Sequence, residues 1–250
     1  MGVRSGLQYV AVAAISFVVI LAVVFASCGG SSGSTTTRSQ VEWAWISGSN
    51  VNGQTGMYGQ IGQAASSNVP GARTGSGSWT DTSGNLWLFG GYGNDSKGNQ
   101  GWLNDLWKYS GGEWTWMSGA DVGNQAGTYG QIGQAASSNV PAARTGSGSW
   151  TDTSGNLWLF GGYGYDSQGH QGWLNDLWKY SGGEWTWMSG ADVGDQAGTY
   201  GQIGQAASSN VPGARSESVS WTDTSGNLWL FGGNGYDSKG NHGLLNDLWK

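Results

Sequence analysis

Residues 84–91 read Gly-Asn-Leu-Trp-Leu-Phe-Gly-Gly, and the same eight residues recur at 155–162 and at 226–233. The identity extends well beyond this stretch, because the segments 70–140 and 141–211 differ at only five of their 71 aligned positions and a third copy follows. A period this strict indicates that the repeat is the unit of structure. It also indicates that each unit buries its apolar faces against its neighbours.

The composition is typical of short strands that are joined by tight turns and packed through large rings. The 250 residues include 48 glycines and 17 tryptophans, far above ordinary usage. Only 10% of the residues are charged, and the formal net charge is -6. The ten lysines and arginines are scattered along the chain, so we expect no nucleic acid partner.

The first 28 residues have the pattern of an export signal. Arg4 precedes an uncharged run, Val10–Ala26, and the run is followed by Ser27-Cys28-Gly29. This pattern resembles a bacterial lipoprotein signal, and the resemblance implies cleavage and lipidation at Cys28. An uncleaved membrane anchor is the alternative, because about 18 apolar residues can span a bilayer. Either interpretation predicts a protein that is exported and membrane-anchored in the bacterial cell envelope, with residues 29–40 as a flexible Gly/Ser/Thr linker.

Within the first copy, alternation and turn residues predict four strands. We expect them at Arg73–Thr80, Asn85–Gly90, Asp105–Tyr109 and Glu113–Ser118. Short turns at 81–85 and at Gly111-Gly112 join the first strand to the second and the third to the fourth. Because these strands are apolar on both faces, sheets of this kind have to stack on one another.

The strand-ending residues resemble the kelch repeat. Gly90-Gly91, Tyr109 and Trp116 carry the resemblance in the first copy, and Gly161-Gly162, Tyr180 and Trp187 carry it in the second. The resemblance implies an all-β, kelch-type β-propeller, like the central domain of galactose oxidase, with four-stranded antiparallel blades. On this basis residues 41–250 hold a lone fourth strand at 41–48 and about three blades at 73–118, 144–189 and 215–250. The period of 71 residues exceeds the kelch period of about 50, and we assign the surplus to a loop between blades at 119–140.

The sequence begins and ends partway through a copy of the repeat. Glu42–Gly48 aligns with 113–119, while the last copy reaches Lys250 before its fourth strand. In kelch-like propellers an N-terminal strand of this kind completes the C-terminal blade. Three blades fall below the propeller minimum of about four. We therefore expect either a fragment of a larger propeller or self-association through open blade edges.

The long connections, 91–104 and 119–143, are predicted to lie at one rim and to carry the binding site. The candidate ligand-binding residues there are Tyr92, Tyr163, Trp102, Trp173, Arg73, Arg144 and Arg215, and the same rim is expected to hold Asp95 and Tyr129. The resemblance implies that the arginines bind acidic ligands at the pore mouth. The alternative is that they pair with carboxylates of the Asp105 type.

We predict no metal site and no cofactor. Residues 95–99 and 166–170 faintly resemble calcium loops but carry too few carboxylates, so turns are expected. His170 and His242 occupy different offsets of the repeat, which argues against a shared metal ion. The copper chemistry of galactose oxidase requires a Cys crosslinked to Tyr, whereas the single cysteine here, Cys28, lies in the signal region.

Repetition also bears on function. Catalysis requires one asymmetric set of groups, whereas near-identical repeats favour several equivalent weak contacts. We therefore expect no catalytic residues and interpret the chain as a surface-tethered binding or scaffolding module for a glycan or a protein. The alternative is a carbohydrate-active enzyme whose active-site residues lie in blades outside this chain.

Overall fold

The computed structural model describes residues 42–250, and Ser47–Lys250 form one compact unit. The predicted signal segment 1–28, Cys28 and the linker 29–40 lie outside the described residues. Within the described part every regular element is a β-strand, and no helix there is long and apolar enough to cross a membrane.

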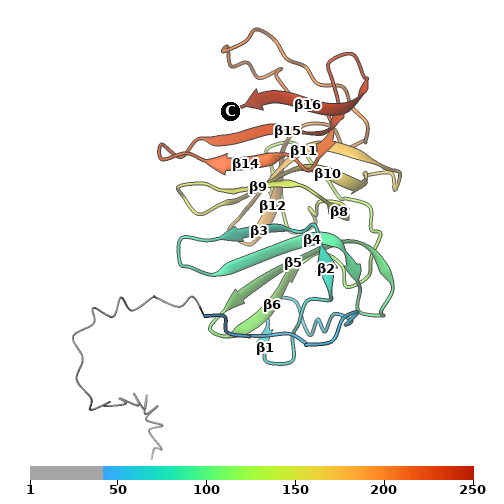
Figure 1. The fold of residues 1–250 in the computed structure, drawn as a ribbon, viewed down its shortest axis with the longest axis vertical. Coiled ribbons are helices and arrows are strands. Elements are labelled where there is room, and N and C mark those ends of the chain that lie inside the picture. Colours follow the sequence, from blue (N-terminus) through green and yellow to red (C-terminus); the bar gives the residue numbers. More distant parts are fainter. Residues whose placement is uncertain (1–41) are drawn as a thin grey trace, which may run out of the picture. The chain divides into compact units, whose positions relative to one another are not determined.

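The strands form three sheets, which we call blades 1 to 3 (Figure 1). Blade 1 contains β1 (Ala64–Ala65), β2 (Arg73–Thr74), β3 (Gly77–Thr80), β4 (Leu86–Asn94), β5 (Gln100–Ser110) and β6 (Glu113–Ser118). Blade 2 contains β7 (Ala135–Ala136), β8 (Arg144–Thr145), β9 (Gly148–Thr151), β10 (Leu157–Tyr165), β11 (Gln171–Ser181) and β12 (Glu184–Ser189). Blade 3 contains β13 (Arg215–Ser216), β14 (Val219–Thr222), β15 (Leu228–Tyr236) and β16 (His242–Trp249).

All strand pairs are antiparallel, and blade 1 runs in the order β1-β6-β5-β4, with β2 and β3 both pairing with β4. The predicted first strand, Arg73–Thr80, is thus confirmed in place but divided in two. Gly75 separates the two pieces, and its φ of 67° is not a strand conformation. The two short turns at 81–85 and 111–112 are confirmed as predicted.

The second and third predicted strands are much longer than the sequence suggested. The Gly90-Gly91 pair does not end β4 but forms a β-bulge between Phe89 and Gly91, with φ of 61° and 94° at the two glycines. Pairing with β5 resumes beyond the bulge and continues to Asn94. The predicted long loop 91–104 is therefore wrong, because this segment is a hairpin whose turn is confined to residues 95–99.

The predicted interblade loop at 119–140 is confirmed over most of its length, with one exception. It carries β7, which pairs with β12, so the surplus residues supply an outer strand to the following blade. Residues 64–65 supply the same strand to blade 1. The matching Ala206-Ala207 is not a strand, and none of the described strands pairs with it. Identical sequences thus become strands only where a partner strand is present.

The predicted lone fourth strand at 41–48 is not observed. The described part of this segment, residues 42–48, contains no strand. A strand requires a hydrogen-bonded partner, and the expected partner, β16, pairs only with β15 among the described strands.

Tryptophans join each blade to the next, as predicted for the strand tryptophans. Trp79, Phe89 and Leu106 of blade 1 pack in one buried cluster with Leu157, Trp178 and Trp185 of blade 2. The indole Nε1 of Trp79 donates a hydrogen bond to Trp158 O at 3.0 Å, and that of Trp150 donates to Trp229 O at 2.8 Å. The strands β3, β9 and β14 follow one another side by side (Figure 1). These stacked antiparallel sheets of six, six and four strands have the architecture of propeller blades.

Candidate binding surface

The hairpin that extends beyond each bulge carries a pair of facing aromatic residues. In blade 1, Tyr92 on β4 lies opposite Trp102 on β5, with ring centroids 5.7 Å apart. In blade 2, Tyr163 on β10 lies opposite Trp173 on β11 at 4.8 Å. The structure thus brings together four of the predicted site residues, on strands and not in loops.

These pairs continue into one another across the blade junctions. Trp102 contacts Tyr163 at 5.7 Å and Tyr165 at 5.8 Å. Trp173 contacts Tyr236 at 6.0 Å and His242 at 4.1 Å. The result is a continuous series of rings along one rim of three blades, which we call the aromatic row, consisting of Tyr92, Trp102, Tyr163, Tyr165, Trp173, Tyr236 and His242.

The aromatic row is rigid and reaches the surface. Its ring contacts are edge-to-face or tilted, an arrangement worth about 0.5–1.5 kcal/mol a pair beyond burial. Tyr92 is 40% exposed, His242 is exposed, and the five other rings are half-buried. Side chains held this way lose little rotamer entropy when a ligand covers them. The row therefore offers an apolar surface with polar edges, which suits a sugar or an aromatic side chain.

Short acidic turns brace the tips of these hairpins. Asp95 Oδ1 accepts hydrogen bonds from the backbone N–H groups of Lys97 and Asn99 at 2.8 and 2.9 Å. Burial tends to raise the pKa of Asp95, but these bonds and a third from Gly123 outweigh it and lower the pKa. Asp166 caps its own turn in the same way. The predicted turns are confirmed, and Asp95 is a buried structural group and does not line the rim surface.

Two equivalent side chains hold the row in place from the following segment. Asn124 Oδ1 accepts the backbone N–H of Trp102 at 3.0 Å, and Asp195 Oδ1 accepts that of Trp173 at 2.9 Å. Both residues have left-handed backbone conformations, with φ of 62° and 61°. The long segments between blades therefore fix the row without covering it.

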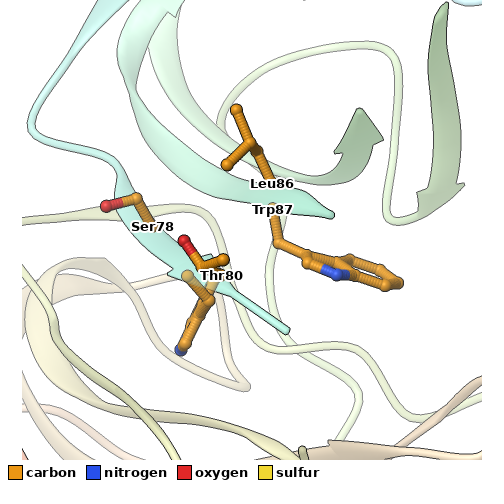
Figure 2. Close-up of a pocket in the computed structure, with 5 residues that line it drawn as sticks. Ser78, Thr80, Leu86 and Trp87 are labelled. Carbon is orange, nitrogen blue, oxygen red and sulfur yellow. The ribbon is translucent and has the colours of Figure 1, made fainter. Parts of the chain in front are cut away.

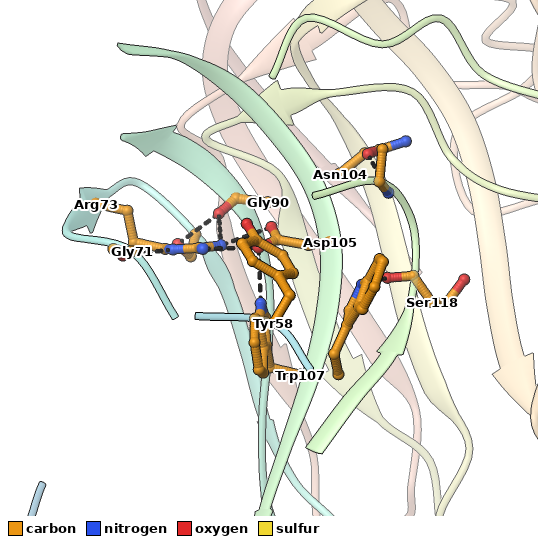
Figure 3. Close-up of polar contacts among 11 residues, drawn as sticks. Tyr58, Gly71, Arg73, Gly90, Asn104, Asp105, Trp107 and Ser118 are labelled. Atoms are coloured by element: carbon orange, nitrogen blue, oxygen red, sulfur yellow. Dashed lines mark hydrogen bonds and ion pairs between the residues drawn. The ribbon is translucent and has the colours of Figure 1, made fainter. Parts of the chain in front are cut away.

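The strand-starting arginines do not belong to this surface. Arg73 binds both carboxylate oxygens of Asp105 at 2.7 Å and also donates to the carbonyls of Gly71 and Gly90 (Figure 3). Asp105 additionally accepts Tyr58 Oη at 2.6 Å and Trp107 Nε1 at 2.7 Å. The prediction of ligand-binding arginines is wrong, because their donors are used inside the blade. The alternative, pairing with carboxylates of the Asp105 type, is confirmed.

The same cluster recurs in the other two blades. Arg144 pairs with Asp176, and Arg215 pairs with Asp247. Burial tends to lower the pKa of Arg144, but the charge of Asp176 outweighs it and raises the pKa. Tyr129, which was expected at the rim, is buried in the core and donates to Asp176 at 2.6 Å. Burial and the neighbouring Asp176 charge raise the pKa of Tyr129, so its hydroxyl stays protonated.

No family model and no curated protein matches this sequence. Among solved structures, the chain is similar to YjhT, with 15% identity, a TM-score of 0.39, and coverage of 65% of this chain and 35% of the other. It is also similar to a fungal alcohol oxidase of the AA5 family in complex with copper, with 10% identity, a TM-score of 0.28, and coverage of 72% and 45%. The chain thus spans less than half of either structure. The blade architecture is established by the sheets described above, and the copper belongs to the oxidase.

Sequence reasoning missed three members of the row, Tyr165, Tyr236 and His242. A signal for them was present, since they occupy positions at which the copies differ. The five differences between the first two copies are G71A, N94Y, K97Q, N99H and N124D, written with first-copy numbers. Three of the five lie at the hairpin tip, and the fourth, Asn124, supports Trp102. Variation between the first two copies is therefore concentrated around the aromatic row.

No group of three His, Cys, Asp or Glu side chains in residues 42–250 is arranged to hold a metal ion. The acidic side chains at the rim instead accept hydrogen bonds from neighbouring backbone and side-chain donors, as Asp95 and Asp195 do. The rings of the aromatic row can stack on a ligand and form hydrogen bonds with it.

Proposed function

We propose that this chain is a non-catalytic binding module whose ligand, a glycan, lies along the aromatic row. One observation carries the proposal: half-buried rings form a continuous surface across three blades, and four of the five differences between the first two copies lie at the hairpin tips of this surface or at Asn124. A core that only had to fold would give no reason for variation to gather at one rim. Different side chains on an unchanged frame support recognition of a ligand with several unequal units.

The row also fits the chemistry of a sugar chain. Pyranose rings pack their C–H faces on aromatic rings and hydrogen-bond through their hydroxyl groups. Tyrosine hydroxyls and Gln171, whose side-chain amide donates to Tyr165 Oη at 2.9 Å, offer polar partners beside the rings. A protein ligand would use the same rings through its own apolar side chains, and it is the other outcome of the binding experiment.

Replacing Trp102 and Trp173 together with Ala is expected to weaken glycan binding by about tenfold or more. Each ring contributes about 1 kcal/mol of stacking, and the two losses act on one ligand that spans both blades. The measurement is an array of neutral oligosaccharides probed with the purified chain, followed by titration calorimetry with the best binder.

The control variants are Thr82→Ala and Ser154→Ala, which lie in exposed turns at the opposite rim. They are expected to leave the affinity unchanged. If the control variants weaken binding and the tryptophan variant does not, the ligand binds at the opposite rim and the proposed surface is wrong. Binding of a protein in place of any glycan, with the same tryptophan dependence, would retain the surface and change the ligand class.

We further propose that the module is held at the membrane of a bacterial cell envelope through a lipid on Cys28. The support is the sequence pattern alone, an apolar run that ends next to a single cysteine. The variant Cys28→Ala is expected to abolish incorporation of a labelled fatty acid, because the chain has no other thiol to accept it. Equal labelling of the variant and the parent chain would contradict this attachment.

A further inference from the structure

The front face of blade 3 is an apolar surface, and no blade in the described part of the chain packs against it. In blades 1 and 2 the equivalent face packs on the next blade through Trp79, Phe89 and Leu106, or through Trp150, Phe160 and Leu177. In blade 3 the same positions are Trp221, Phe231 and Leu248, and they are 49%, 40% and 58% exposed. Together with Trp229 they line a hollow of about 560 Å³.

The rear face of blade 1 is open in the complementary way. Leu86 is 49% exposed, whereas its counterpart Leu157 is 2% exposed under blade 1. Leu88 is half-buried, whereas Leu159 and Leu230 are buried at the two junctions. A second hollow, of about 300 Å³, lies beside Leu86 between Ser78 and Thr80 (Figure 2).

We infer that the front face of blade 3 binds the rear face of blade 1 of a second copy, head to tail. The two internal junctions already show that these faces fit, because each places the front residues of one copy against the rear residues of the next. A second copy presents those same rear residues. Hiding two apolar faces of this size from water drives association.

The repeat assigns the hydrogen bonds of this interface. Within the chain, Trp79 Nε1 donates to Trp158 O and Trp150 Nε1 donates to Trp229 O. By the same 71-residue step, Trp221 Nε1 donates to Trp87 O of the second copy. Ser149 Oγ donates to Ser78 O, and Ser220 Oγ donates to Ser149 O, both at 3.2 Å. By the same step, Ser78 Oγ of the second copy donates to Ser220 O of the first copy.

Two substitutions on β13–β14 make this contact weaker than the internal junctions. Val219 occupies the position of Gly148 in the second copy of the repeat. A Cβ added at Gly148 would lie 3.1 Å from the Leu230 side chain, whose counterpart in a second chain is Leu88. The larger Val219 side chain therefore has to displace Leu88 of the second chain. Glu217 stands where the first copies have Gly75 and Gly146, and a Cβ at Gly75 would lie 2.1 Å from Thr145 Oγ1. Leu88 and Thr74 of the second copy have room to move, because no blade covers them. The interface is therefore reversible.

The contact is heterologous, so it either closes into a ring of two copies or continues as an open chain of copies. It also places Leu244, 90% exposed, in the position that Trp102 takes against Tyr163 at the internal junction. The neighbour in the second copy is Tyr92, the first ring of the aromatic row. The row would thus continue from one copy into the next.

Cysteine pairs in the full-length Cys28→Ser chain test the inference. The variant Ser78→Cys/Ser149→Cys joins neighbouring strands of one chain and is the positive control for oxidation. The variant Ser78→Cys/Ser220→Cys places the two thiols in the same relation only across two copies, because β9 lies between β3 and β14. The chain is kept in detergent micelles, oxidised, and resolved on a non-reducing gel. The Ser78→Cys/Ser220→Cys variant is expected to give dimers or a ladder of oligomers. If this variant gives only monomer while the control variant forms its disulfide, the inference is overturned.

Two further changes separate a specific contact from random collision. Adding Leu248→Glu is expected to lower the crosslinked fraction about tenfold, the effect of about 1.4 kcal/mol at the interface. Leu248 is exposed in the single chain, so this change leaves the fold intact. Adding Glu217→Gly/Val219→Gly restores the residues of the internal junctions and is expected to raise the crosslinked fraction. Crosslinking that ignores Leu248→Glu, or that falls with the two glycines, overturns the inference.

Discussion

Asp176→Ala is expected to cost about 3–5 kcal/mol of unfolding free energy, enough to remove most of the stability of an ordinary domain. The Asp176 carboxylate is fully buried and accepts two bonds from Arg144, one from Tyr129 and one from Trp178. Removing it leaves a fully buried guanidinium without a counter-charge. The measurement is urea unfolding followed by tryptophan fluorescence.

The repeat supplies a matched control for this prediction. Asp247 makes the same contacts to Arg215, Tyr200 and Trp249, but its side chain is 16% exposed. Burial tends to raise the pKa of Asp247, but bonds from Arg215, Tyr200 and Trp249 outweigh it and lower the pKa to about 2. Asp247→Ala is expected to cost less, because the Asp247 side chain borders solvent and water can enter the space that it leaves beside Arg215. Equal losses of unfolding free energy in Asp176→Ala and Asp247→Ala would show that burial does not determine the cost of breaking the ion pair. The double variant Arg144→Met/Asp176→Leu is expected to recover much of the loss, since apolar groups can replace a buried ion pair.

Gly161→Ala is the second change with a large expected effect, about 3 kcal/mol or more. Its φ of 59° costs an L residue about 1–2 kcal/mol. An added Cβ would also lie 2.7 Å from Arg215 O in blade 3 and 2.8 Å from Leu174 O in its own blade. Neither backbone oxygen can move without opening a junction or breaking the bulge. Thermal and urea unfolding of the variant measure the loss.

Gly232→Ala is the matched control for Gly161→Ala. Gly232 has nearly the same φ, 63°, and meets Leu245 O at 2.8 Å, but no following blade lies against it. The difference between the two variants isolates the approach of one blade to the next. We expect Gly161→Ala to be the more damaging by about 1 kcal/mol or more. Indistinguishable losses would mean that φ and the bulge alone require the glycine.

What the sequence predicted well depends on local chemistry. The turns at 81–85 and 111–112 follow from Asp, Asn and Gly residues that act within a few positions of themselves. The stacking of strand tryptophans follows from strands that are apolar on both faces. These features need no knowledge of what lies next to the strand.

What the sequence did not predict depends on contacts between distant residues. Gly90-Gly91 has the composition of a strand end, but its role as a bulge becomes visible only when β5 is known to pair on both sides of it. Tyr129 lies in a polar, glycine-rich segment, yet it reaches Asp176, 47 residues along the chain. The aromatic row required knowing that Trp102 meets Tyr163 of the next copy. The residue types identified Tyr92, Trp102, Tyr163 and Trp173 as candidates, but the sequence did not show which residues they contact.

The 71-residue copy at 70–140 carries the outer strand of its successor, since β7 follows β6 in sequence but pairs with β12, and the copy at 141–211 carries the same residues at 206–207. A copy thus contains both the residues that contact the preceding blade and the residues that contact the following blade. Gain or loss of a whole copy would leave every remaining junction with its tryptophan, its buried arginine and its outer strand. An array built this way can change in length by recombination between copies without a mismatch inside the protein, so the number of blades is free to vary while the construction of each blade stays fixed.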